Sequence, residues 1–201
     1  CLSCGYRRAW PSLVDALVLA ACEDDDIPDK IAGGVITLQR VPLSRLERLN
    51  EDVVSLYRAG RYAEAIPPAE RALQMGEKAL GPEHLEVSTS LNNLALLYVA
   101  TGDYAKAEPL LQRALQMREQ ALGPEHLTVA TSLTNLAELY RTTGDYAKAE
   151  PLLQRALQMR EKALGPEHLT VATSLTNLAE LYRTTGDYAK AEPLYQRALR
   201  I

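Results

Sequence analysis

Histidine is the residue type of this chain best suited to acid–base or metal chemistry, and it occurs at His84, His126 and His168. Each stands in the same Gly-Pro-Glu-His sequence, and the three copies are evenly spaced along the chain. A zinc ion holds its nitrogen ligands at about 2.1 Å, whereas equivalent points of successive helix pairs lie roughly 10–20 Å apart. No Ser or Cys nucleophile stands with a His and an acid, and there is no Gly-rich phosphate loop. We therefore predict no enzyme activity, no metal site and no cofactor.

The histidines belong to a longer internal repeat. The segment from Gly123 to Leu152 recurs without a change from Gly165 to Leu194, and a looser copy begins at Gly81. The distance from Gly81 to Gly123 equals that from Gly123 to Gly165, so the period is constant. A more divergent unit precedes these copies over residues 56–80. Self-similarity at a fixed period of this size is typical of repeat architectures.

The divergent first unit does not align evenly with the second. Gly60 lies one full period before Gly102, but Tyr57 lies one residue less than a period before Tyr98. We therefore expect either that the first unit has lost a residue in its turn or that its first helix is out of register.

Each unit is predicted to contain two helices. The apolar residues of the first recur at steps of three and four, as in an amphipathic helix: Val129, Leu133, Leu136, Ala137 and Tyr140. Thr128 is the expected N-cap, because its hydroxyl can accept a hydrogen bond from a first-turn N–H group. Gly144 is expected to end this helix in the left-handed conformation.

The second helix is expected to begin after Asp145 and to stop at Gly165-Pro166. Its apolar stripe is Tyr146, Ala149, Leu153, Ala156, Leu157 and Leu164. Pro151 removes one backbone hydrogen bond, but it lies near the start, so we expect a slight bend rather than a break. Small residues such as Ala137 and Ala149 let the two helices approach closely. One hairpin cannot bury both apolar faces, so successive hairpins must stack.

The residues of these two helices resemble the tetratricopeptide repeat signature: Leu136-Ala137, Tyr140, Gly144-Asp145-Tyr146, Ala149 and Ala156. The 42-residue period, the Leu-Gly-Pro-Glu-His linker and the Leu-Asn-Asn-Leu-Ala sequence at Leu91 are similar to the kinesin light chain type. The resemblance implies an all-α, right-handed superhelical solenoid of antiparallel helix hairpins. We expect an N-terminal segment over 1–42 and four repeats over about 43–84, 85–126, 127–168 and 169–201, the last of them truncated.

In such a solenoid the first helices line the concave groove. The stripe of the first helix that points away from its packed residues is Thr131, Asn135, Glu138 and Thr142, with copies at Thr89, Asn93, Leu96 and Ala100 and at Thr173, Asn177, Glu180 and Thr184. The resemblance implies that Asn at this helix position binds the backbone of an extended peptide, since an amide offers both a donor and an acceptor. The candidate peptide-binding residues are Asn93, Asn135, Asn177, Glu138, Glu180, Arg141 and Arg183. The arginines could anchor acidic groups of a partner. The competing interpretation is a solvated helix face, on which Arg141 pairs with Glu138.

Composition narrows the function classes further. The 22 Lys and Arg against 26 Asp and Glu give a net charge of -4, which argues against a nucleic-acid partner, because such proteins are normally basic. No apolar run is long enough to span a membrane. We predict a non-catalytic scaffold for a protein or peptide partner. The alternatives are the sensor arm of a larger signalling protein, such as a STAND-type NTPase or a caspase-like peptidase, and a lipid-anchored bacterial lipoprotein.

The N-terminal residues leave two interpretations open. Cys1 and Cys4 form a two-residue-spaced pair without a second half, which disfavours a zinc or redox site. The apolar stretch that ends in Leu-Ala-Ala-Cys22 is similar to a lipoprotein signal in which Cys22 is lipidated. Pro11 and Asp15 interrupt that stretch, so we favour an amphipathic helix from Pro11 to Cys22 and a cytoplasmic location. Residues 27–40 could form a short strand or a loop.

The last unit stops halfway along its second helix, at Ile201. Solenoids normally end in a polar cap, so Leu194, Ala198 and Leu199 are expected to be partly bare. Such a patch could support self-association, and we expect the chain to be a fragment of a longer protein.

Overall fold

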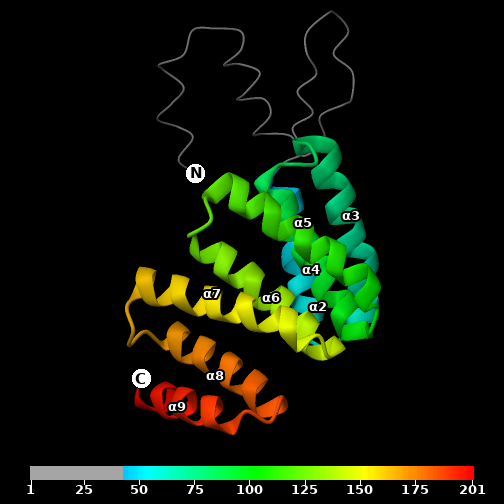
Figure 1. Cartoon of the computed structure of the whole chain (residues 1–201). Helices are drawn as coiled ribbons and strands as arrows, with labels where there is room; N and C mark the ends of the chain where they lie inside the picture. Colours follow the sequence, from blue (N-terminus) through cyan, green and yellow to red (C-terminus); the bar gives the residue numbers. More distant parts are fainter. Residues whose placement is uncertain (1–42) are drawn as a thin grey trace, which may run out of the picture. The chain divides into compact units, whose positions relative to one another are not determined.

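The computed structural model describes residues 43–201, and within them every regular element is an α-helix. The helices are α2 (Leu43–Arg58), α3 (Tyr62–Leu80), α4 (Leu85–Thr101), α5 (Tyr104–Leu122), α6 (Leu127–Thr143), α7 (Tyr146–Leu164), α8 (Leu169–Thr184) and α9 (Tyr188–Arg200). They form four antiparallel pairs that follow one another from α2 to α9 (Figure 1). The predicted all-α solenoid is confirmed. The expectations for Cys1, Cys4, the segment from Pro11 to Cys22 and residues 27–40 lie outside the described residues.

The turn inside each hairpin depends on a glycine in the left-handed region. Gly144 has φ 83° and follows the last residue of α6, as predicted. The N–H of Asp145 donates to the carbonyl of Tyr140 at 2.8 Å, and that of Gly144 donates to Arg141 at 3.2 Å. These bonds satisfy carbonyls that the helix end would otherwise leave unpaired. A residue with a Cβ would be strained at this φ.

The N-cap predictions are only partly right. Thr128 is not the cap of α6, because that helix already begins at Leu127. The cap is His126, whose Nδ1 accepts the N–H of Thr128 at 3.2 Å, and His84 and His168 cap α4 and α8 in the same way. Asp145 does precede α7, but its carboxylate makes no cap hydrogen bond; it pairs with Lys148 Nζ at 2.7 Å.

The linker glycine after α7 and the proline inside α7 both behave as the sequence predicts. Gly165, with φ 88°, ends α7. Pro151 lies inside an unbroken α7, in the first two turns, where a missing N–H costs one intrahelical bond. The expectation that it would not break the helix is confirmed.

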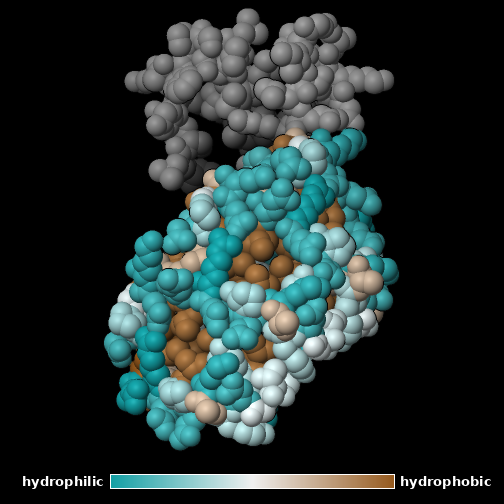
Figure 2. Space-filling model, viewed as in Figure 1, coloured by the Kyte–Doolittle hydropathy of each residue, from teal (hydrophilic) through white to brown (hydrophobic). Residues whose placement is uncertain are grey.

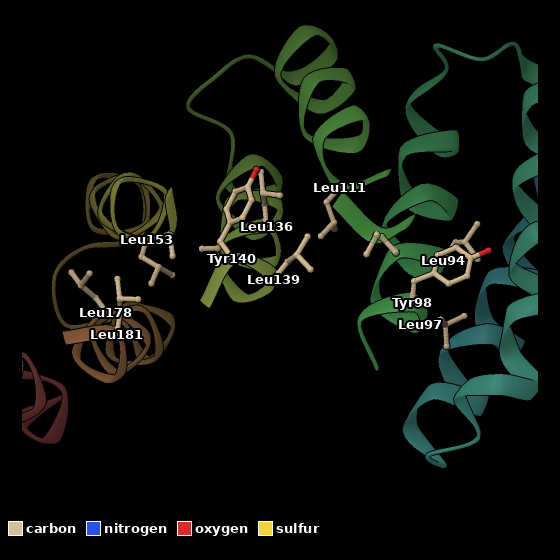
Figure 3. Close-up of a cluster of buried hydrophobic side chains, with 14 of the residues drawn as sticks. Leu94, Leu97, Tyr98, Leu111, Leu136, Leu139, Tyr140, Leu153, Leu178 and Leu181 are labelled. Atoms are coloured by element: carbon tan, nitrogen blue, oxygen red, sulfur yellow. The ribbon is translucent and has the colours of Figure 1, made fainter. Parts of the chain in front are cut away.

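The core lies between the two helices of each pair and continues from pair to pair. Ala137, Ala149 and Ala156 are at most 1% exposed, which lets the helix backbones approach closely, as predicted. Leucines of α4 to α8 fill the space beside them (Figure 3). On the face seen in Figure 2, apolar side chains lie in furrows between hydrophilic ridges. Each hairpin therefore buries its apolar faces only by stacking on the next.

Repeated polar contacts connect the neighbouring pairs. Tyr140 OH on α6 donates to Glu108 of α5 at 2.8 Å, and burial raises the pKa of this phenol. Arg155 of α7 pairs with Glu119 of α5 at 2.7 Å and donates to the Pro124 carbonyl of the linker at 2.9 Å. The carboxylate and the carbonyl together hold the guanidinium in one orientation, which favours a fixed spacing between successive hairpins.

The first hairpin keeps the common register, so both expectations for it are wrong. The N–H of Arg61 donates to the carbonyl of Leu56 at 3.0 Å, which is the counterpart of the bond between Asp103 and Tyr98. Leu56 therefore occupies the place of Tyr98, one full period earlier. Tyr57 is the neighbouring residue and its ring lies 5.1 Å from that of Tyr62. Neither a lost residue nor a shifted helix is needed.

The last helix exposes part of its apolar side. Leu199 is 87% exposed, whereas Leu194 and Ala198 are half-buried. The expected bare flank is therefore present mainly at Leu199.

Candidate partner-binding groove

The first helices of neighbouring pairs, α2, α4 and α6, contact one another along the array. Side-chain amides connect these helices. Asn93 Nδ2 donates to Asn50 Oδ1 at 3.4 Å, and Asn135 Nδ2 donates to Asn92 Oδ1 at 2.8 Å. Two of the three predicted asparagines thus use one N–H donor in a hydrogen bond to the first helix of the preceding pair. Among the described residues, none donates to the Oδ1 of either Asn93 or Asn135.

Asn177 differs from the other two. The residue one helix back in the same register is Thr134, whose hydroxyl donates to the Ala130 carbonyl at 2.9 Å. Within residues 43–201 the side chain of Asn177 has no hydrogen-bond partner, and it is half-buried. Of the predicted asparagines, Asn177 has the side-chain amide with the most unused hydrogen-bonding capacity.

A shallow, open pocket of about 450 Å³ lies between α2 and α4. Its lining residues are Asn50, Glu51, Val54, Ser55, Arg58, Thr89 and Asn93. Thr89 and Asn93 belong to the predicted stripe. The α2 residues did not figure among the predicted site residues, because the first repeat diverges and its register was uncertain.

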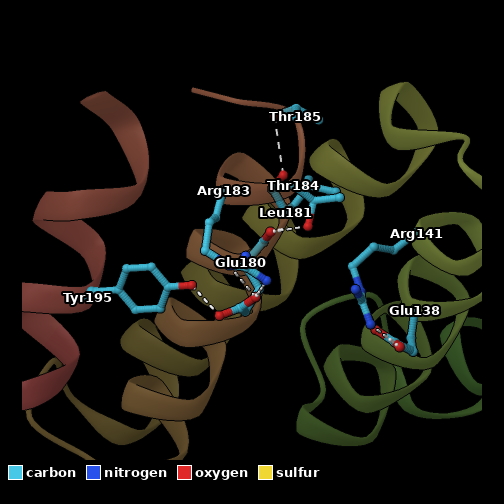
Figure 4. Close-up of polar contacts among 8 residues, drawn as sticks. All are labelled: Glu138, Arg141, Glu180, Leu181, Arg183, Thr184, Thr185 and Tyr195. Atoms are coloured by element: carbon cyan, nitrogen blue, oxygen red, sulfur yellow. Dashed lines mark hydrogen bonds and ion pairs between the residues drawn. The ribbon is translucent and has the colours of Figure 1, made fainter. Parts of the chain in front are cut away.

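The four charged candidates form pairs within their own helices. Arg141 donates to both carboxylate oxygens of Glu138, at 2.8 and 2.6 Å, and Arg183 donates to one oxygen of Glu180, at 2.9 and 2.8 Å. Figure 4 shows the two pairs on α6 and α8, with the hydroxyl of Tyr195 directed at Glu180. These pairs are partly exposed to solvent, so each adds little to stability.

The ion pairs shift the pKa values of their members. The hydrogen bond from Arg183 is the main cause of a lowered pKa at Glu180, and the bond from Tyr195 adds to it. The hydrogen bond with Glu138 raises the pKa of Arg141. Both groups are therefore held in their charged forms, and the arginines already have a carboxylate before any partner arrives.

Two threonines of the predicted stripe donate hydrogen bonds to carbonyls of their own helices. Thr142 Oγ1 donates to the Glu138 carbonyl at 2.8 Å, and Thr184 Oγ1 donates to the Glu180 carbonyl at 2.7 Å. Both hydroxyls therefore already have an acceptor on their own helix.

Other features bear on chemistry and on membranes. In the described part of the chain, no cluster of His, Cys, Asp or Glu side chains is placed to hold a metal ion. None of the helices from α2 to α9 is long and apolar enough to cross a membrane.

The stacked hairpins with a repeated small-residue core define a helical repeat solenoid. The tetratricopeptide repeat model matches residues 53–120, 98–162 and 128–201, and the chain belongs to the tetratricopeptide repeat family. Repeats of this family form protein-interaction scaffolds that bind protein or peptide partners, and family members are typically non-catalytic. No curated protein matches the sequence significantly.

Solved structures place the repeats with the kinesin light chain type. BtubC (BKLC) from P. vanneervenii superposes with a TM-score of 0.71 at 27% identity, over 77% of this chain and 62% of that chain. The putative kinesin light chain protein from Podosopora anserina, with nearly identical TPR-like repeats, gives 0.71 at 27% identity, over 78% and 74%. A Rap protein complexed with competence and sporulation factor gives 0.70 at 20% identity, over 80% and 43%, which shows the fold alone. The chain thus spans less than two thirds of BtubC and of the Rap protein.

Proposed function

We propose that the chain binds an extended segment of a protein partner in the groove lined by its first helices, and that it performs no chemistry of its own. The observation that carries the proposal is the open pocket between α2 and α4, which Asn93 and Thr89 line. Asn93 is one of the three asparagines to which the family resemblance assigns peptide binding. A backbone N–H and C=O placed there could pair with amides that the array itself uses only in part.

The three asparagines would contribute unequally to binding. Asn177 has both its donors and its acceptor available among the described residues, whereas Asn93 and Asn135 each keep one donor and the acceptor. The ion pairs of Glu138 with Arg141 and of Glu180 with Arg183 lie beside this row on the same helices. A partner's carboxylate would compete with a protein carboxylate for either arginine, so these four residues tune specificity more than affinity.

The experiment that tests this proposal changes Asn93, Asn135 and Asn177 together to Ala and measures peptide binding by fluorescence anisotropy. Peptides come from display selection on the wild-type chain. We expect the triple variant to lose most of its affinity, because buried polar groups of a bound peptide would be left without partners. An unchanged affinity for every selected peptide would remove the groove from consideration.

A matched control separates binding from stability. Asn92→Ala removes the acceptor that Asn135 uses between α4 and α6, but it leaves all three groove amides in place. We expect this variant to bind as the wild type does and to melt at a slightly lower temperature. Asn177→Ala is the converse case: it should weaken binding with no loss of a described hydrogen bond.

A further inference from the structure

The four first helices differ at two groove positions that are three residues apart. On α6 and α8 these positions hold ion pairs, and on α2 and α4 they hold apolar residues. The pairs are Val54 with Tyr57, Leu96 with Val99, Glu138 with Arg141, and Glu180 with Arg183. We infer that the groove takes an extended protein segment with apolar side chains at the end that lies on α2 and α4 and polar ones at the end that lies on α6 and α8. The inference rests on the proposed function and names the chemistry of its partner.

The apolar half has side chains available for a partner. Val54 lines the pocket between α2 and α4. Leu96 takes the place of Val54 one full period later and lies three residues after Asn93. Both are half-buried, and neither belongs to the buried clusters of the described repeats or to the side chains packed on them. Covering these two residues would remove apolar surface from water without disturbing the core.

The half of the groove on α6 and α8 disfavours apolar side chains of a partner. The side chains of Glu138 and Arg141 are 52% and 34% exposed, so water solvates both ends of that ion pair. An apolar side chain laid over the pair would strip this water and return no hydrogen bond, which is unfavourable. A polar side chain or a peptide group could instead donate to the carboxylate. The half on α2 and α4 therefore favours the apolar end of a bound segment, and the half on α6 and α8 favours its polar end.

On α4, only one of the two apolar residues is open to a partner, because Val99 is already packed. Its side chain packs against the core cluster, so it contributes little to the groove, and Leu96 is the contact residue of this helix. On α2 the ring of Tyr57 is turned to Tyr62, and Val54 remains as the groove residue. The proposal therefore depends on two side chains, Val54 and Leu96.

The test selects binders from a random dodecapeptide display library on the full chain. We expect the apolar residues of the selected peptides to cluster in one half of the sequence. The double variant Val54→Glu and Leu96→Glu makes the apolar half resemble the charged half. We expect it to lower the affinity for the selected peptides about tenfold, because an apolar side chain of the peptide would no longer be covered. Leu199→Glu, at an exposed leucine of α9, is the matched control and should leave affinity unchanged.

The outcomes separate the two proposals. Peptides whose affinity depends on the three groove asparagines, but not on Val54 and Leu96, would overturn the inference and keep the proposed function. Apolar residues scattered evenly over the selected sequences would overturn the inference as well. Peptides that are insensitive to the asparagines would remove both proposals. If the double Glu variant fails to fold by circular dichroism, Leu96→Ser replaces it, with the same loss of affinity expected.

Discussion

Arg118 on α5 and Arg160 on α7 occupy the same position in two successive repeats. Two residues that act on Arg118, Ser88 and Glu86, are replaced by Ala130 and Thr128 in the next repeat. Both are buried, at 6% and 7% exposure, and neither forms a salt bridge with a described residue. Arg118 donates from Nε to Ser88 Oγ at 3.0 Å and from Nη1 to Ser132 Oγ at 2.7 Å. It thereby connects its own repeat with the next one.

Arg160 keeps only half of this arrangement. Its Nη1 donates to Ser174 Oγ at 2.7 Å, but Ala130 stands where Ser88 stands in the earlier repeat. The Nε of Arg160 has no described protein acceptor. Burial lowers the pKa of both arginines, and at Arg118 the charge of Glu86 partly offsets the effect. The comparison shows that near-identical repeats are coupled to their neighbours unequally.

The largest expected effect comes from removing the better-paired arginine. Arg118→Ala should lower the free energy of unfolding by about 2–3 kcal/mol, because it removes a packed side-chain stem and leaves two serine hydroxyls without a donor. Arg160→Ala should cost about 1 kcal/mol less, since one hydrogen bond fewer is lost. Urea unfolding of both variants measures the difference. Equal losses would contradict the comparison.

The sequence predicted the hairpins well because their signals are local and repeated. The constant period, the glycine at each turn and the small residues Ala137 and Ala149 are all visible in the repeated segments. The caps were predicted less well, because His126 is not among the usual capping residues and Thr128 stands two positions later. Thr128 does take part, but through its backbone N–H.

The contacts between the first helices were harder to predict than the hairpins. Their amide bonds join residues of different repeats, as in Asn92 with Asn135, and a helical wheel drawn for one repeat cannot show them. The buried arginines could have been found from the sequence. Arg118 follows Ala114 by four residues and therefore falls on the buried stripe of its helix. A charged residue at such a position signals a specific partner.

A smaller effect is expected from the serine that distinguishes the two sites. Ser88→Ala should lower the free energy of unfolding by about 1–2 kcal/mol, because the Nε of Arg118 would then lose its acceptor. Ser88 Oγ also donates to the Leu85 carbonyl at 2.6 Å, and this bond adds to the loss. Chemical denaturation measures the cost. A variant as stable as the wild type would show that the Arg118 site gains nothing from its second serine.

The smallest effect, and the only gain, should come from Ala130→Ser. Ala130 is fully buried, but Ser88 occupies the equivalent place, so the repeat accommodates a hydroxyl there. The new Oγ could accept the Nε of Arg160 and donate to the carbonyl of Leu127, three residues earlier, as Ser88 does to Leu85. We expect a gain of about 0.5–1 kcal/mol in the free energy of unfolding. Combining Ala130→Ser with Arg160→Met should abolish the gain, because the hydroxyl would then lack its donor. A gain that survives in the double variant would mean that the serine acts through its own helix and not through the arginine.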